Sequence, residues 1–177
     1  PCKCSVNPNV YFSQYGLPQD HKVSGDEAKK KILIIGAGPA GLEAARTMRM
    51  RGYTNVTVVD QKKKACGLLN LAQVLNDELP PMVDWYNNEI KRLNIDVRLN
   101  TEVTPAYIKD FGADEVILAV GPETVSPDVP GKDNKNVIDS HALKALVEGK
   151  GTPGKGFMWT MSCFGMNVLG APLGIMK

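Results

Sequence analysis

The segment KILIIGAGPAGLEAARTMRMRG, residues 31–52, decides the fold of this chain. Its first six residues end at Gly36 and form a continuous apolar, β-branched run, which is typical of a parallel strand covered on both faces. Residues 39–52 then place apolar side chains on one helical stripe and end at Gly52. A second buried strand is predicted over 55–60. Together these elements form a βαβ unit of about the usual 30 residues.

Strands and helices continue to alternate beyond this unit. The further predictions are a helix over 79–94, a strand over 95–100, a short helix over 104–111, strands over 114–120 and 136–139, and a helix over 140–149 with Ser140 as its N-cap. This order predicts an α/β fold, a Rossmann-like doubly wound parallel sheet. We expect an extended N-terminal arm over 1–28, the dinucleotide-binding domain over 29–150, and an apolar C-terminal tail over 151–177 that links to or packs on another domain.

Composition narrows the possible partners. The chain has 177 residues, of which 43% are hydrophobic and 23% charged, which predicts one substantial core. Its formal net charge of +2 favours neither nucleic acid nor an anionic membrane as a partner. No signal peptide or membrane span is recognised, so a cytoplasmic setting is expected. Four cysteines are too few for a disulfide framework, namely Cys2, Cys4, Cys66 and Cys163.

The sequence GAGPAG contains the strongest chemical signal. Gly36, Gly38 and Gly41 form a GxGxxG pattern that follows a predicted buried strand and opens a predicted helix. The first glycine permits a tight turn, the second lets backbone approach a pyrophosphate, and the third lets helix and strand pack closely. Pro39 and Ala40, which lie between the glycines, are candidate cofactor neighbours for the same reason. Free N–H groups at the helix start would stabilise the phosphates.

An acidic residue completes this fingerprint. Asp60 ends the second predicted strand, where it can accept hydrogen bonds from a ribose diol, and Gln61 follows it as a further candidate. The three lysines over 62–64 could indicate a site for a 2′-phosphate. We interpret them as a solvated turn, because the acidic strand end repels that phosphate.

Three stretches together carry a family resemblance. The stretches are KKILIIGAGPAGLEAARTMRMRGY (30–53), CGLLNLA (66–72) and DEVILAVGPETVSPDVPG (114–131). With Asp60, they resemble the FAD-binding region of multidomain NADH:flavin oxidoreductases, the group of 2,4-dienoyl-CoA reductase, enoate reductase and trimethylamine dehydrogenase. The resemblance covers about residues 4–150. It implies that Gly67, Leu68 and Gly121 lie near FAD. Cys66 stands where a second glycine is common in the family.

The arm carries a second resemblance. CSVNP, residues 4–8, is similar to the family stretch with the last ligand of a 4Fe-4S cluster. This similarity implies that Cys4 is a cluster ligand in the intact protein, and an exposed free thiol is the alternative. The family resemblance also implies an intact enzyme that passes electrons from NAD(P)H through FAD and the cluster to FMN, with the remaining domains or subunits as partners.

We expect the isolated chain to be an incomplete enzyme without catalytic residues of its own. Hydride transfer from NAD(P)H needs a second dinucleotide site. The string GKGTPG, residues 149–154, also fits GxGxxG, but it follows a predicted helix and contains Pro153. No strand leads into it, so we interpret it as a linker.

Three other functions are alternatives for a chain with this fingerprint. A non-catalytic ADP-binding module like that of some relatives of trimethylamine dehydrogenase would share the same fingerprint. A flavin disulfide reductase needs a CxxC pair, whereas Cys2 and Cys4 are separated by one residue. A nicotinamide dehydrogenase needs a catalytic acid or base, and the two histidines are His21 in the arm and His141 near a helix start. FAD binding within a larger oxidoreductase, with ADP binding as the alternative, is therefore the prediction.

Overall fold

The computed structural model describes residues 21–147 except 124, 126, 133, 135, 136 and 138. These residues belong to two compact units, one containing those up to 69 together with 80–121, and one containing 70–79 together with those from 122 onwards. The elements in chain order are α2 Gly25–Ala28, β1 Lys31–Ile35, α3 Pro39–Arg51, β2 Asn55–Val59, α4 Leu69–Leu75, α5 Pro80–Arg92, β3 Asp96–Arg98, α6 Pro105–Phe111, β4 Glu115–Leu118 and α7 Ser140–Val147.

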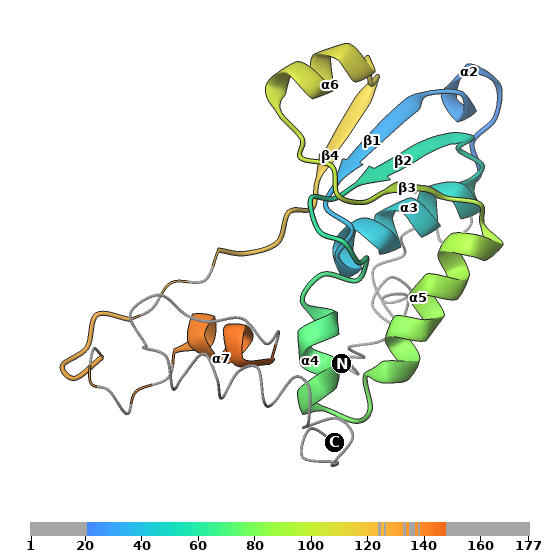
Figure 1. The fold of residues 1–177 in the computed structure, drawn as a ribbon. Helices are drawn as coiled ribbons and strands as arrows, with labels where there is room; N and C mark the ends of the chain where they lie inside the picture. Colours follow the sequence, from blue (N-terminus) through green and yellow to red (C-terminus); the bar gives the residue numbers. More distant parts are fainter. Residues whose placement is uncertain are drawn as a thin grey trace. The chain divides into compact units, whose positions relative to one another are not determined.

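The sheet of the first unit is parallel throughout. Its four strands lie in the order β3-β2-β1-β4, so β1 occupies an interior position (Figure 1). Ile34 of β1 is in register with Val58 of β2 and with Ile117 of β4. Both neighbours of β1 come later in the chain and lie on its opposite sides, as in a doubly wound sheet. This topology confirms the predicted Rossmann-like α/β class.

The core lies between the sheet and two helices. Helix α3 packs on β1 and β2, and α5 packs on α3 (Figure 1). Leu42 and Ala45 supply the buried stripe of α3, while Ile34 and Val58 of the strands are fully buried. Removing these apolar groups from water favours folding by about 25 cal/mol for each Å² buried. The burial therefore holds the start of α3 against the ends of β1 and β2.

Charged side chains form ion pairs between α3 and α5. Glu89 of α5 is 9% exposed, and its carboxylate lies 2.5 Å from Arg92 Nε and 3.8 Å from Arg46 of α3. Glu43 is also paired with Arg46, at 2.8 Å. The hydrogen bond from Arg92 is the main cause that lowers the pKa of Glu89, against the opposing effect of burial. The carboxylate is thus kept ionised although it is nearly covered.

The arm and the loop after β2 each contain a helix that the sequence did not predict. Helix α2, Gly25–Ala28, lies within the expected arm, and its four residues are too few to show a helical period. Helix α4, Leu69–Leu75, begins where only a glycine-rich turn was expected. Gly67, just before this helix, favoured a turn in the sequence prediction, and the short apolar helix after it was therefore not recognised.

The second unit differs from prediction at the start of α7. This helix begins at Ser140, and the Asp139 carboxylate accepts a hydrogen bond from the Ala142 N–H at 2.7 Å. The predicted N-cap, Ser140, was therefore wrong by one residue, because the aspartate oxygen reaches the first-turn amide. Of the strand expected over 136–139, Val137 and Asp139 are not in a strand, and the other two residues lie outside the described part.

None of the helices in the described part of the chain is long and apolar enough to cross a bilayer. The expected arm up to residue 20, the end of the expected helix over 140–149, the linker at 149–154 and the expected tail over 151–177 lie outside the described residues.

Candidate dinucleotide-binding site

The glycine loop lies at the carboxyl end of β1, between its two neighbouring strands. The Gly36 N–H donates to the Val59 carbonyl at 2.8 Å, and the Ala119 N–H donates to the Ile35 carbonyl at 2.8 Å. Strand order reverses at this point, because β2 and β4 pair with β1 on its opposite sides. Ligands of open α/β sheets bind in the crevice outside the carboxyl ends of such strands.

The first and third glycines of the loop leave no room for a side chain. Gly36 has a left-handed φ of 109°, and a Cβ there would lie 2.7 Å from the carbonyl carbon of Ala119. A Cβ on Gly41 would collide with the carbonyl oxygen of Gly36 and lie 3.3 Å from the Ala119 Cβ. Larger residues would therefore push α3 and β4 away from the end of β1.

The second glycine faces open space. Gly38 has an extended backbone with φ −76° and ψ 179°, and a Cβ there would have no heavy atom within 4 Å. Gly38 is also the N-cap of α3, Pro39 and Ala40 follow in the first turn, and no side chain caps the helix. The amides of this first turn lack partners within the helix. They present donors and the positive end of the helix dipole to the space in front of Gly38.

Asp60 is fixed against this loop by two backbone amides. Its Oδ2 accepts from the Ala37 N–H at 2.7 Å, and its Oδ1 accepts from the Lys62 N–H at 2.7 Å. The backbone on either side is held as well, because the Asp60 N–H donates to Arg98 and its carbonyl accepts from Thr101. A carboxylate has about four acceptor positions, so each oxygen can still accept from a ribose hydroxyl.

The loop after β2 returns to the glycine loop at Cys66 and Gly67. The Cys66 N–H donates to the Ala37 carbonyl at 2.7 Å, and a Cβ on Gly67 would lie 3.0 Å from the Gly38 Cα. Cys66 has a left-handed φ of 74° although it is not glycine. Its side chain is fully buried, and burial raises the pKa of the thiol, so it is not a ready nucleophile. The backbone at Cys66 and Gly67 thus approaches the glycine loop closely, although cysteine stands where a second glycine is common in the family.

The remaining predicted cofactor neighbours surround the loop less closely. Gln61 is exposed, Leu68 is half exposed, and Gly121 has a left-handed φ of 79° with nothing within 4 Å of an added Cβ. The lysines over 62–64 are exposed, as expected of a solvated turn. The cofactor-binding role of Gln61, Leu68 and Gly121 stays a prediction.

Sequence reasoning missed three residues that shape the site. Ala37 makes the two hydrogen bonds that join the glycine loop to Asp60 and to Cys66, and Ala119 closes the space beside Gly36 and Gly41. The small residue at the end of an apolar strand was a usable signal for Ala119. Nothing in the identity of Cys66 indicates a left-handed backbone, which depends on the surrounding structure.

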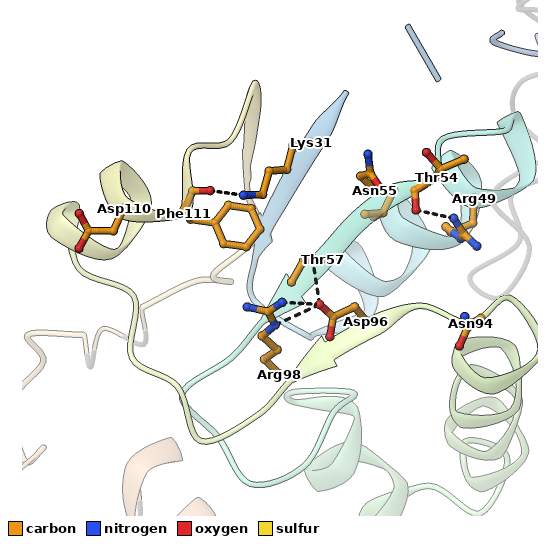
Figure 2. A pocket seen from close by; sticks show the side chains of 11 residues that line it. Lys31, Arg49, Thr54, Asn55, Thr57, Asn94, Asp96, Arg98, Asp110 and Phe111 are labelled. Atoms are coloured by element: carbon orange, nitrogen blue, oxygen red, sulfur yellow. Dashed lines mark hydrogen bonds and ion pairs between the residues drawn. The ribbon is translucent and has the colours of Figure 1, made fainter. Parts of the chain in front are cut away.

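A cleft of about 670 Å³ lies at the other end of the strands (Figure 2). It is lined by Lys31, Asn55 and Asp96, the first residues of β1, β2 and β3, among others. Its cations already have protein partners: Lys31 donates to the Phe111 carbonyl, Arg98 to Asp96, and Arg49 to backbone carbonyls. Arg98 is thus neutralised by a carboxylate, while Lys31 and Arg49 are held in place by neutral carbonyls.

The predicted cluster ligand Cys4 lies outside the described residues, as do Cys2 and Cys163. Within the described residues, no three His, Cys, Asp or Glu side chains are placed to hold a metal ion. Cys66 is a free thiol.

The geometry of the glycine loop is that of a dinucleotide-binding loop, and comparisons with known proteins point to the same kind of domain. The sequence matches the family described as pyridine nucleotide-disulphide oxidoreductase over residues 5–111 and 30–150. The chain belongs to this family. The match spans the glycine loop, Asp60 and all four strands of the sheet.

Relatives of this chain include two curated reductases. Cinnamate reductase of Clostridium sporogenes is 35% identical over 133 residues, which cover 73% of this chain and 19% of that protein. The multifunctional alkene reductase/demethylase OYE of Caballeronia cordobensis is 39% identical over 140 residues, which cover 77% of this chain and 20% of that protein. The chain thus spans about a fifth of the length of these relatives. The comparisons confirm the predicted family resemblance.

A solved structure also supports the family resemblance. A complex of 2-naphthoyl-CoA reductase matches with a TM-score of 0.70 and 32% identity, covering 85% of this chain and 22% of that one. The name of the family mentions disulphides, but this chain has no CxxC pair, and its Cys66 thiol is buried. Family membership therefore concerns the dinucleotide-binding fold and does not bring thiol chemistry to the described residues.

Proposed function

We propose that this chain binds FAD through its adenosine diphosphate half, as part of an oxidoreductase related to ene reductases. The observation that carries the proposal is the contrast within the glycine loop. Gly36 and Gly41 are enclosed by backbone and by Ala119, whereas Gly38 faces open space at the uncapped start of α3. A pyrophosphate needs this opening together with free amide donors.

The residues present fit such a cofactor. The first-turn amides of α3 would bind the pyrophosphate, with Pro39 and Ala40 beside it, while the Asp60 carboxylate would accept from the adenosine ribose. Gly67 lies next to Gly38 and would let the second loop approach the cofactor, and we place Gln61, Leu68 and Gly121 around it. Within the described residues, these groups hold and orient the cofactor, and we assign none of them a catalytic role.

The proposed role in the intact protein is electron transfer between NAD(P)H and a cluster or FMN site. Bound FAD can exchange hydride with a nicotinamide and pass electrons onward, which is chemistry of the cofactor. The relatives named above reduce or demethylate small organic molecules according to their names, which supports an ene-reductase-like activity. NAD(P)H, FMN and a 4Fe-4S cluster would be bound with or by the remaining domains or subunits.

Competition between FAD and ADP tests the cofactor proposal on the chain itself. Addition of the chain should quench or shift the fluorescence of FAD in a saturable way, and ADP should displace FAD because both use the glycine loop. Failure of FAD to bind would contradict the proposal. FAD binding that ADP cannot reverse would show that the adenosine half is not the recognised part.

The cluster ligand is tested in the longer polypeptide. Cys4→Ser should lower the iron content and abolish the redox signal of the 4Fe-4S cluster, because a cubane takes four thiolates. Cys2→Ser provides the matched control, since it changes the same atom two residues away and should leave the iron content unchanged. Unaltered iron in Cys4→Ser would remove Cys4 from the cluster.

A further inference from the structure

Ala37, the residue between the first two glycines, has both of its backbone polar groups held by other loops. Its N–H donates to Asp60 Oδ2 at 2.7 Å, and its carbonyl accepts from the Cys66 N–H at 2.7 Å. We call these two hydrogen bonds the Ala37 clamp. They join the glycine loop to both ends of the segment that follows β2.

The clamp determines where the Gly38 amide points. The Ala37 carbonyl and the Gly38 N–H belong to one planar trans peptide, so they point in opposite directions. By holding the carbonyl, Cys66 directs the Gly38 N–H away from the loop that contains Cys66. The Asp60 carboxylate holds the preceding peptide in the same way, because it accepts from the Ala37 N–H.

Two further features show that the clamp is built into the fold. Cys66 keeps a left-handed backbone, which is costly for a residue with a Cβ and persists only where its surroundings impose it. Asp60 also accepts from the Lys62 N–H through its second oxygen, so the carboxylate has one orientation when it meets Ala37. Because two backbone amides hold the Asp60 carboxylate, it is less free to turn away from Ala37 toward a ligand.

We propose that Asp60 is a positioning residue for the phosphate-binding loop, in addition to its expected contact with ribose. Resting on the proposed function, this means that the Ala37 clamp sets the Gly38 amide in place before the pyrophosphate arrives. Preorganised donors bind more tightly because the ligand does not have to order them. The carboxylate therefore contributes to the recognition of phosphate groups that it does not touch.

The two roles of Asp60 predict different ligand dependences. A carboxylate that only binds ribose is irrelevant for 2′,3′-dideoxy-ADP, which lacks both hydroxyls. A carboxylate that also orients the loop matters for both ADP and 2′,3′-dideoxy-ADP. The comparison separates binding from folding, because a loss of stability alone would not depend on the ribose hydroxyls.

Asp114, which directly precedes β4, provides a matched control at the other end of β1. Its Oδ2 accepts from the Lys31 N–H at 2.7 Å, so it makes the same kind of carboxylate–amide bond at the opposite end of β1. Asp114→Ala removes that bond without altering the glycine loop. It should leave the affinity for both nucleotides unchanged.

Titration calorimetry with ADP and 2′,3′-dideoxy-ADP tests the clamp on wild type, Asp60→Ala, Asp60→Asn and Asp114→Ala. We expect Asp60→Ala to weaken ADP binding by about 100-fold and dideoxy-ADP binding by about tenfold, since hydrogen bonds to a charged group are the stronger kind. Asp60→Asn keeps one oxygen for the Ala37 amide, so it should restore most of the affinity for dideoxy-ADP.

The outcomes distinguish the two proposals. Wild type that binds neither nucleotide would overturn the proposed function and the clamp with it. Wild type that binds both nucleotides, with dideoxy-ADP affinity unchanged in both Asp60 variants, would leave the dinucleotide site intact and overturn the positioning role of Asp60 alone. Weakened dideoxy-ADP binding in Asp60→Ala, with wild-type affinity in Asp114→Ala, is the result that supports the clamp.

Discussion

The two ends of β1 use the same device for different purposes. At the amino end, the Asp114 carboxylate accepts from the Lys31 N–H, and the adjoining cleft has cations that already contact protein oxygens. At the carboxyl end, the Asp60 carboxylate accepts from the Ala37 N–H, and the loop beyond it opens at Gly38. A cleft lies at the amino end, but the helix donors without intrahelical partners are at the carboxyl end. We therefore expect the ligand at the carboxyl end, where backbone donors are unmet.

The largest effect is expected at the enclosed part of the loop. Gly36→Ala places a Cβ 2.7 Å from the Ala119 carbonyl carbon on a left-handed backbone. It should lower the free energy of unfolding by about 3 kcal/mol and weaken ADP binding by at least about 100-fold. Chemical denaturation and calorimetry measure the two effects.

Gly112→Ala is the control for backbone strain. Gly112 also has a left-handed φ, 62°, but a Cβ there would meet nothing within 4 Å, and it ends α6 away from the loop. We expect a loss of about 1 kcal/mol in stability and no change in ADP affinity. If Gly36→Ala behaved like Gly112→Ala, the enclosed geometry at Gly36 would be wrong.

The open part of the loop should separate binding from stability. Gly38→Ala adds a methyl group to an extended backbone with no atom within 4 Å, so the free energy of unfolding should not fall. The methyl group enters the space assigned to the pyrophosphate, and ADP should bind about tenfold or more weakly, roughly 1.4 kcal/mol. Unchanged ADP affinity would place the ligand elsewhere.

The ion pairs between α3 and α5 should affect stability without affecting binding. Glu89→Gln removes the nearly buried carboxylate beside Arg46 and Arg92 and should lower the free energy of unfolding by about 1 kcal/mol at neutral pH. The folded pKa of Glu89 is lowered, so its contribution is present above the ordinary value of 4.5 and is lost as the pH falls through the folded pKa. Chemical denaturation from pH 7 to pH 3 should show the free energies of unfolding of wild type and Glu89→Gln becoming equal in acid. A constant difference would contradict the assigned pKa shift.

The smallest effect is expected in the cleft. Arg98 pairs with Asp96 at 2.8 Å, and both side chains are about half exposed. Arg98→Ala should change the free energy of unfolding by less than about 1 kcal/mol and leave ADP binding unchanged. A marked loss of ADP affinity would move the candidate site to the amino ends of the strands.

The elements that the sequence predicted correctly are those whose residues carry their own signal. Apolar β-branched runs identified β1 and β2, and GxGxxG with Asp60 identified the loop. These features depend on the side-chain size and charge of residues at fixed spacings, which the sequence shows directly. Gly52 was correctly expected near the end of α3, where it has a left-handed φ of 107°. Glycine removes the steric cost of that conformation, so the residue type is informative.

The features that the sequence did not reveal depend on contacts between distant segments. The left-handed backbone of Cys66 follows from its hydrogen bond to Ala37 and its burial. The cap of α7 was misassigned because Asp139 and Ser140 are both good N-caps, and only the backbone geometry selects the aspartate. Such choices are made by tertiary structure and leave no periodic pattern in the sequence.

Amide shifts during an ADP titration test the proposed site most directly. In ¹⁵N-labelled wild type, we expect saturable shifts at Gly38, Ala40 and Gly41, the loop and first-turn amides of α3, and at Ala37 beside Asp60. The amides of Lys31 and Asn55, at the amino ends of the same sheet, should remain unchanged. Shifts concentrated at Lys31 and Asn55, with the glycine loop unaffected, would contradict dinucleotide binding at the carboxyl end of β1.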